Sequence, residues 1–157
     1  YDLRMPAQLT TAAFKILIEI ATWSGNYTAV DLKMMEVIAM DVCYPLIAFN
    51  GDLIRFFGTN PSGQNLTVYL NSIVNSLLFR MGFFHTYPRY RRTFRSAVAL
   101  TTYGDDAKSS VKKGFDSFNH ISFAQFLADN DMKFTMPDKE SEPTEYMTDE
   151  DADFLKR

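Results

Sequence analysis

The sequence lacks three features that define familiar protein classes: paired cysteines, a long apolar run and an excess of basic residues. The single cysteine, Cys43, cannot form an internal disulfide, and its setting predicts a buried or half-buried thiol in a reducing compartment. The most apolar segment, residues 12–21, is too short for a membrane span and contains Lys15 and Glu19. The formal net charge of −3 argues against a generally basic nucleic-acid coat.

Clusters of metal-binding histidine and cysteine are missing as well. The two histidines, His85 and His120, have no such neighbours at metal-ligand spacing, so we expect both to pack or to cap rather than to bind a metal. The 157 residues are, however, 46% hydrophobic and 15% aromatic. This composition is enough to bury a core, and it predicts one globular domain or part of a larger one.

Apolar residues at helical spacing predict two helices in the first third of the chain. The first spans about residues 6–23, and the second follows a cap formed by Thr28 and Asp31 and ends before Pro45. The second helix carries an apolar stripe made of Met34, Val37, Ile38 and Val42. Its methionines are expected to fill a core rather than to form a binding surface.

Two further helices are expected later in the chain. The third starts near Gln64, and a short fourth helix covers about residues 120–131. One face of the third helix is expected to be apolar, with Leu66, Leu70 (or Tyr69), Ile73, Leu77 and Met81 on it.

Turn signals predict two antiparallel hairpins. Asn50-Gly51 lies between two β-prone runs, which is the strongest short-range hairpin signal. A second hairpin is expected from a strand over residues 94–103, a turn at Gly104 and a return strand over residues 106–111. Residues 132–136 are expected to add a final strand. Helices that alternate with antiparallel hairpins indicate an α+β fold.

Two charged segments have simple interpretations. The acidic run over residues 140–153 has little periodicity and is expected to be a solvated loop. The basic run contains Arg89, Arg91, Arg92 and Arg95, which either contact RNA phosphates or line a solvated strand entrance. The second interpretation is favoured.

Two adjacent carboxylates, Asp105 and Asp106, follow the turn glycine of the second hairpin. Like charges repel, so this pair indicates a partner of positive charge. Mg²⁺ is a hard cation that prefers oxygen ligands, and paired carboxylates suit it. Because consecutive strand residues point to opposite faces, we assign Asp105 the primary metal contact and Asp106 the supporting one. Taken alone, the pair fits an ordinary acidic turn equally well.

A second constellation precedes this hairpin, with Ser62-Gly63 followed by Thr67 and Asn71. Thr67 and Asn71 are one helical turn apart and therefore share a face. The simple alternative is an ordinary helix start, in which Ser62 is the N-cap and the other two are polar surface. That alternative leaves the spacing to the Tyr-Gly-Asp-Asp hairpin unexplained.

Together these motifs resemble the RNA-dependent RNA polymerases of picorna-like positive-strand RNA viruses. The run from Ser62 to Asn71 resembles their motif B, and Tyr103-Gly104-Asp105-Asp106 resembles motif C. The details of "YGDDAKSSVK" are most similar to polymerases of the marnavirus-like group from marine algae and protists.

Three weaker matches lie in the order that the family has. Residues 135–139, which end in Lys139, resemble motif D. Residues 154–157 resemble the start of motif E, the primer grip, and Tyr1-Asp2 resembles the end of motif A. The resemblance therefore covers the whole chain.

The resemblance implies a partial right-hand polymerase palm over residues 1–157, an antiparallel sheet with helices on one face, with about residues 44–60 as a fingers hairpin. The implied reaction is template-directed RNA synthesis, in which a primer 3′-hydroxyl attacks the α-phosphate of a ribonucleoside triphosphate and pyrophosphate leaves. Two Mg²⁺ (or Mn²⁺) ions would be held by Asp105, Asp106 and an aspartate upstream of Tyr1.

The implied partners are an RNA template and primer, ribonucleoside triphosphates and the remainder of the viral polyprotein. The expected location is the host-cell cytoplasm, at viral replication complexes.

The resemblance also assigns nucleotide-binding roles to five residues. Asp2 and Asn71 would hydrogen-bond each other and the ribose 2′-hydroxyl, and Thr67 would support that network. Ser62 and Gly63 would form a flexible loop that admits the nucleotide.

The remaining motif residues are basic. Lys139 would act as a general acid toward pyrophosphate, unless it is a solvent-exposed lysine beside Asp138. Lys156 and Arg157 would contact primer phosphates. Because the first motif A aspartate and the thumb are absent from this sequence, we expect the chain alone to be inactive and to bind Mg²⁺ weakly.

A function of a different class stays open. The chain would then be a non-catalytic RNA-binding or interaction module whose acidic hairpin binds a structural Ca²⁺ ion.

Overall fold

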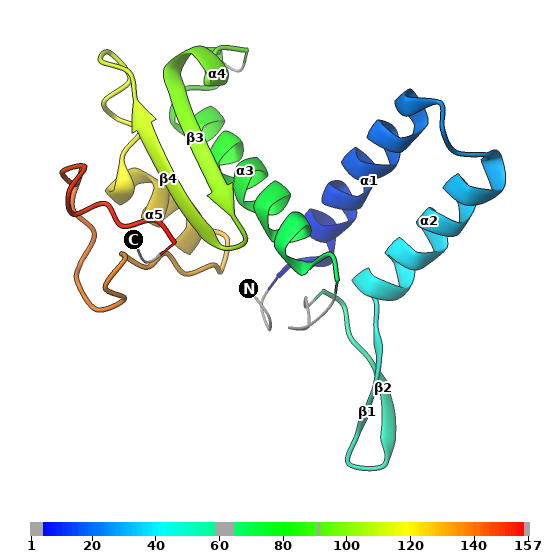
Figure 1. The fold of residues 1–157 in the computed structure, drawn as a ribbon. Coiled ribbons are helices and arrows are strands. Elements are labelled where there is room, and N and C mark those ends of the chain that lie inside the picture. Colours follow the sequence, from blue (N-terminus) through cyan, green and yellow to red (C-terminus); the bar gives the residue numbers. More distant parts are fainter. Residues whose placement is uncertain (1–4, 59–64, 91, 156–157) are drawn as a thin grey trace. The chain divides into compact units, whose positions relative to one another are not determined.

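Helices and small antiparallel hairpins alternate along the chain, which confirms the α+β fold (Figure 1). The structure, a computed structural model, describes residues 5–58, 65–90 and 92–155. It divides into two compact units, Tyr1–Val74 and Asn75–Arg157. Within the described ranges, no helix is long and apolar enough to cross a membrane.

The first unit begins with two helices, α1 (Ala7–Ser24) and α2 (Ala29–Cys43), whose limits follow from their caps. α1 ends at Gly25, which takes a φ of 69° and donates its N–H to the carbonyl of Thr22. α2 begins with a capping box: the Thr28 N–H donates to the Asp31 carboxylate at 2.8 Å, and the Asp31 N–H donates to the Thr28 hydroxyl at 3.3 Å. Both helices match their predicted ranges.

The predicted Asn-Gly hairpin follows α2. Strands β1 (Leu46–Phe49) and β2 (Asp52–Arg55) pair antiparallel, with Phe49 opposite Asp52 at the turn. Asn50 and Gly51 have φ values of 48° and 91°, and two positive values are what a type I′ turn requires. Cys43, just before this hairpin, is 1% exposed, and burial raises the pKa of its thiol. The expected buried thiol is therefore confirmed.

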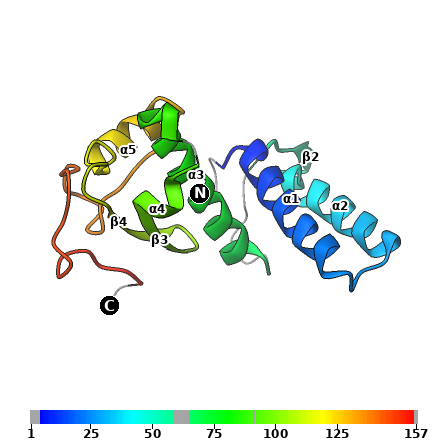
Figure 2. The same ribbon diagram turned by 90° about the horizontal axis from the view of Figure 1, so that it is seen from above.

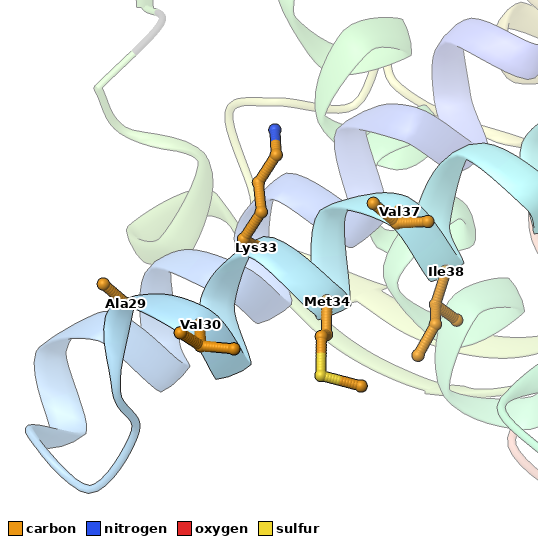
Figure 3. A pocket seen from close by; sticks show the side chains of 6 residues that line it. All are labelled: Ala29, Val30, Lys33, Met34, Val37 and Ile38. Carbon is orange, nitrogen blue, oxygen red and sulfur yellow. The ribbon is translucent and has the colours of Figure 1, made fainter.

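The apolar stripe of α2 does not fill a core in this structure, contrary to the sequence expectation. Met34, Val37 and Ile38 are 59%, 53% and 51% exposed, and together with Ala29, Val30 and Lys33 they line a shallow hollow (Figure 3). Helical spacing establishes that these side chains share a face, but it does not say whether another element covers that face.

The third helix, α3 (Thr67–Thr86), runs from the first unit into the second. Its described start lies at Thr67, and Gln64, the predicted start, lies outside the described residues. The five predicted apolar residues share a face, but this face is not the buried one: Leu70 is 0% exposed, whereas Leu66 and Met81 are 36% and 44% exposed. The buried face instead contains Leu70, Asn71, Val74, Asn75, Leu78, Phe79 and Phe83. Apolar residues occur on several sides of this helix, so spacing alone does not select the buried one.

The second unit continues with a 3₁₀ turn, η1 (Pro88–Tyr90), a helical turn, α4 (Phe94–Ala97), and the predicted hairpin of β3 (Val98–Tyr103) and β4 (Asp106–Val111). The last helix is α5 (His120–Ala128). Figures 1 and 2 show α5 and the C-terminal half of α3 on the same side of the β3–β4 hairpin.

Two predicted strand segments of this unit are wrong. Residues 94–97 form α4 because one helical turn buries both Phe94 (4% exposed) and Ala97 (2% exposed). Residues 132–136 form no strand, and the sheet of this unit contains only β3 and β4 among the described residues. Their side chains pack instead: Phe134 stacks on His120 at 5.8 Å, and Met136 is 4% exposed.

An aromatic cluster forms the core of the second unit. Phe83 of α3 is 0% exposed. Its ring centroid lies within 6.1 Å of five other rings, those of Phe84, Tyr87, Phe94, Phe115 and Phe118. Gly82 lets α5 approach this helix, since a Cβ there would lie 2.8 Å from a ring carbon of Phe123.

We expect Phe83→Ala to lower the melting temperature of the complete polymerase by about 10 °C. Loss of a buried phenylalanine costs about 3–5 kcal/mol, because the surrounding rings close the cavity only in part. Calorimetry would measure the shift, with Phe57→Ala as the control because Phe57 is 79% exposed. An equal shift in both variants would contradict the central role of Phe83.

The acidic C-terminal segment is irregular, as expected for a loop, but several bonds attach it to the second unit. Lys108 Nζ lies 2.7 Å from the carboxylate of Asp149. The carbonyl of Glu145 accepts the His120 N–H at 3.2 Å, and the Tyr146 hydroxyl donates to the carbonyl of Asp116 at 2.9 Å. The loop is therefore attached to α5 and β4 by an ion pair and hydrogen bonds.

Both histidines pack, as expected from the sequence. His85 lies against the ring of Phe126 at 5.6 Å, and His120 Nδ1 lies 3.1 Å from the carbonyl of Thr144. Burial lowers the pKa of His120.

Candidate active site

The two adjacent carboxylates lie at the tip of the β3–β4 hairpin. Tyr103 pairs with Asp106, which leaves Gly104 and Asp105 as the two turn residues. Gly104 has a φ of 61° and Asp105 does not have a positive φ, the pattern of signs in a type II′ turn. Asp105 is therefore a turn residue and Asp106 a strand residue. The pair is not equivalent, as predicted, but the reason is the turn and not strand alternation.

A buried amide side chain of α3 donates hydrogen bonds to the backbone of this turn. Asn75 is 4% exposed, and its Nδ2 donates to the carbonyl of Asp105 at 2.9 Å and to that of Asp106 at 3.5 Å. A hydrogen bond made by a buried side chain fixes the backbone of the turn more firmly than a bond to water would. The carbonyls point toward α3, and the two carboxylates remain exposed.

Asn75 lies outside the motifs by which the sequence predicts site residues. A signal was present, since Thr67, Asn71 and Asn75 follow each other at intervals of four residues and continue one polar row along the helix. The motif B pattern covers only the first two members of this row. The contact between Asn75 and the turn joins residues 30 positions apart, which helical spacing does not reveal.

Neither carboxylate at the tip is neutralised by the described part of the chain. The two ion pairs found there join Lys33 to Glu36 and Lys108 to Asp149. Lys108 is two residues beyond Asp106 and so on the same strand face, yet its ammonium group is engaged by Asp149. The oxygens of Asp105 and Asp106 are thus exposed and available to an external cation.

Lys139 occupies an exposed turn in the same unit. Its N–H donates to the carbonyl of Met136 at 2.9 Å, and its φ is 65°. The neighbouring Asp138 carboxylate accepts the N–H and the hydroxyl of Ser141, and these bonds lower the pKa of Asp138. Within the described residues, no hydrogen bond or ion pair joins Lys139 to Asp138 or to the hairpin carboxylates.

The other predicted site residues divide into two groups. Thr67 is the first residue of α3, and Asn71, one turn later, is 6% exposed. The remaining ones, Asp2, Ser62, Gly63, Lys156 and Arg157, lie outside the described residues. Among the residues that are described, no group of three or more His, Cys, Asp or Glu side chains gathers around a possible metal position.

Comparison with known proteins gives a consistent result. The family model described as "Viral RNA-dependent RNA polymerase" matches residues 1–157. The genome polyprotein of deformed wing virus is 29% identical over 97% of the chain, and the matched region is 5% of that polyprotein.

Two plant-virus proteins are similar as well. The RNA1 polyprotein of broad bean wilt virus 1 is 32% identical over 90% of the chain. The RNA1 polyprotein of red clover mottle virus is 37% identical over 88% of it. In both comparisons the chain spans 8% of the length of the curated relative. The family match over the whole sequence shows that this chain belongs to the viral RNA-dependent RNA polymerases, with homologues in the polyproteins of picorna-like viruses.

Proposed function

We propose that the chain is the central part of a polymerase palm and contributes Asp105 and Asp106 to a site for template-directed RNA synthesis. The observation that carries this proposal is the exposed pair of carboxylates on a hairpin turn that Asn75 holds from α3. Family membership makes RNA synthesis the function to which such a pair is best suited.

The donor set fits a hard divalent cation such as Mg²⁺ or Mn²⁺. Asp105 and Asp106 offer carboxylate oxygens that no described cation neutralises. A third carboxylate, from the first aspartate of motif A, would complete the set. When bound, two such ions activate the primer hydroxyl and balance the charge of the leaving pyrophosphate. Asp105 is the proposed primary ligand, and Asp106 the supporting one.

Lys139 is the proposed proton donor to pyrophosphate. The ammonium group of Lys139 is exposed. The carboxylate of the neighbouring Asp138 is hydrogen-bonded to Ser141 and does not pair with that ammonium group. An exposed, unpaired lysine on an irregular turn can approach a phosphate without first breaking an ion pair. Lys156 and Arg157 are proposed to contact primer phosphates.

Nucleotide recognition is proposed for the residues of motifs A and B. Asp2 and Asn71 would bind the ribose 2′-hydroxyl, with Thr67 in support, and the loop at Ser62 and Gly63 would move as the nucleotide enters.

Asn71→Ala should lower the preference for ribonucleotides over deoxyribonucleotides about tenfold. A site that hydrogen-bonds a hydroxyl disfavours the analogue without it, and removal of the amide removes that penalty. Competing incorporation of each ribonucleotide and its deoxyribonucleotide would measure the ratio, and misincorporation of wrong bases would serve as the control. An unchanged sugar ratio would remove Asn71 from sugar recognition.

The remaining proposals concern the placement of the segment. We propose a palm for residues 1–157, with about residues 44–60 as a fingers hairpin. In support, Leu46, Phe49 and Leu53 of that hairpin are 53%, 63% and 68% exposed, so a further part of the polymerase has apolar surface to cover. We also propose a marnavirus-like source, on the motif "YGDDAKSSVK", and activity in the host-cell cytoplasm at viral replication complexes.

The test of this function is primer extension. The complete polymerase that contains this chain should extend an RNA primer on an RNA template in the presence of Mg²⁺ or Mn²⁺, and the 157-residue chain alone should not. The same primer-extension test can be made with a chimera, in which this chain replaces the matching segment of the red clover mottle virus protein. Binding of Ca²⁺ by the hairpin without any synthesis in the complete protein would favour the non-catalytic alternative.

A further inference from the structure

The charge of the chain is distributed very unevenly. Residues 53–104 contain no aspartate or glutamate, although the whole sequence has 19 acidic residues and a net charge of −3. The next segment, residues 107–115, is also free of acids and contains three lysines. Within each stretch no acidic residue lies between the basic ones, so most pairing of these cations depends on the fold.

The fold brings six of these cations to one end of the second unit, a group that we call the arginine surface. It consists of Arg80, Arg89, Arg92, Arg95, Lys112 and Lys113. The position of Arg91, in the same run, lies outside the described residues.

Contacts of aromatic rings and backbone groups connect the elements that carry this surface. The guanidinium carbon of Arg80 lies 4.6 Å from the ring centroid of Phe94, which begins α4. The N–H of Lys112 donates to the carbonyl of Ala97, at the end of α4, at 2.8 Å. The ring of Tyr90 meets that of Phe115 at 5.7 Å. Thus α3, η1, α4 and the end of β4 converge at this place.

Acidic groups do not compensate these cations. Arg89, Arg92, Arg95, Lys112 and Lys113 are exposed, and none of them forms an ion pair with a described residue. Burial lowers the pKa of Arg80, and the positive charge of Arg95 lowers it further. The nearest acid in sequence, Asp116, accepts the N–H of Gly114 at 3.0 Å. Like charges gathered without compensation repel each other, and a polyanion would relieve that repulsion.

The chemistry of the surface favours RNA as that polyanion. Arginine presents a planar fork that matches phosphate oxygens. Tyrosines alternate with the arginines, and Tyr90 is 51% exposed, so a ring is available for a base to stack on. An anionic membrane would instead be expected to need exposed aliphatic residues beside the cations.

This surface is distinct from the catalytic tip. It adjoins the Val98–Val111 end of the β3–β4 hairpin, whereas Asp105 and Asp106 lie beyond the Tyr103–Asp106 pair at the other end. Five residue steps at about 3.4 Å each separate the two ends by about 17 Å.

We propose that the arginine surface binds the phosphate backbone of single-stranded RNA outside the catalytic site and holds template on the polymerase independently of sequence. The inference rests on the proposed function in RNA synthesis, and it adopts the RNA-phosphate interpretation of the arginine run in place of the solvated strand entrance that the sequence favoured.

The test compares two triple variants of the complete polymerase. One is Arg89→Gln, Arg92→Gln, Arg95→Gln; Arg80 is left in place because it packs on Phe94. The matched control, Lys15→Gln, Lys33→Gln, Lys133→Gln, removes the same charge from exposed lysines elsewhere. Fluorescence anisotropy with a labelled single-stranded RNA oligonucleotide gives Kd at several salt concentrations, and melting temperatures verify folding.

The arginine variant should bind the RNA about tenfold more weakly at low salt. Its slope of log K against log salt should be shallower by about 2, because each lost phosphate contact removes about 0.7 for single strands. The apparent KM for template should rise more than the maximal rate falls. The lysine control should retain the wild-type Kd and slope.

Three outcomes would overturn the inference. One is an unchanged Kd and slope in the arginine variant. Another is an equal loss in the lysine control, which would indicate a nonspecific effect of net charge. The third is a loss of binding to phosphatidylserine vesicles while RNA binding stays normal, which would assign the surface to a membrane. Primer extension by the wild-type protein tests the proposed function separately from the RNA-binding role of the arginine surface. If the wild-type protein extends no primer, the proposed function fails, and the anisotropy data still show whether the arginine surface binds RNA.

Discussion

Asp105→Asn in the complete polymerase should reduce RNA synthesis roughly a thousandfold while RNA binding changes little. An amide of the same shape lacks the charge that a divalent cation requires, and loss of several kcal/mol of transition-state stabilisation corresponds to about that factor. Asp106→Asn should have a smaller effect, because Asp106 is assigned the supporting contact. Single-nucleotide extension across a Mg²⁺ titration would measure both.

The chain offers a closely matched control for this pair. Asp52 is the first residue of β2, directly after the Asn50-Gly51 turn, just as Asp106 is the first residue of β4 after its own turn. Asp52→Asn should leave synthesis at the wild-type rate. Near-normal synthesis by Asp105→Asn would mean that the hairpin carboxylates do not hold the metal.

Asn75→Leu should lower the maximal rate about a hundredfold, the second largest effect that we expect. Leucine has a similar volume but cannot donate to the Asp105 carbonyl, so the turn loses the bond that fixes it. Misplacement of reacting groups by about 1 Å is sufficient for a loss of this size. The Mg²⁺ concentration needed for half-maximal rate should rise, and the KM for template should stay close to wild type.

Two further variants separate a positioning role from a general loss of stability. Asn75→Asp keeps the shape but replaces the donor by a second acceptor, so it should be at least as damaging as leucine. Asn130→Leu is the control, because Asn130 Nδ2 donates to the carbonyl of Phe126 at 2.8 Å, away from the turn. If both asparagine-to-leucine variants lose rate and melting temperature equally, Asn75 has only a structural role.

Local signals in the sequence were sufficient for most element limits. The Thr28–Asp31 capping box and Gly25 bound two helices, and the turn glycines Gly51 and Gly104 set the two hairpins. Each of these signals acts within about four residues, through a cap or a positive φ, and so needs no distant partner. The order of the polymerase motifs can likewise be established without the fold, because it is a property of the sequence itself.

Tertiary packing decided the remaining features. It selected the buried face of α3, turned residues 94–97 into a helical turn so that Phe94 and Ala97 enter the core, and left residues 132–136 without a strand partner. A strand needs a neighbour to pair with and an apolar face needs a cover, and neither is encoded in local spacing.

The candidate site likewise combines features that the local sequence determines with features that only packing determines. Sequence by itself determined that Asp105 and Asp106 follow a turn glycine and that Thr67 and Asn71 share a helix face. Only the tertiary structure joined Asn75 to the turn and gathered arginines from α3, η1 and α4 at the far end of the hairpin. The physical reason is that both features depend on contacts between residues distant in sequence, which form when the helices pack beside the hairpin.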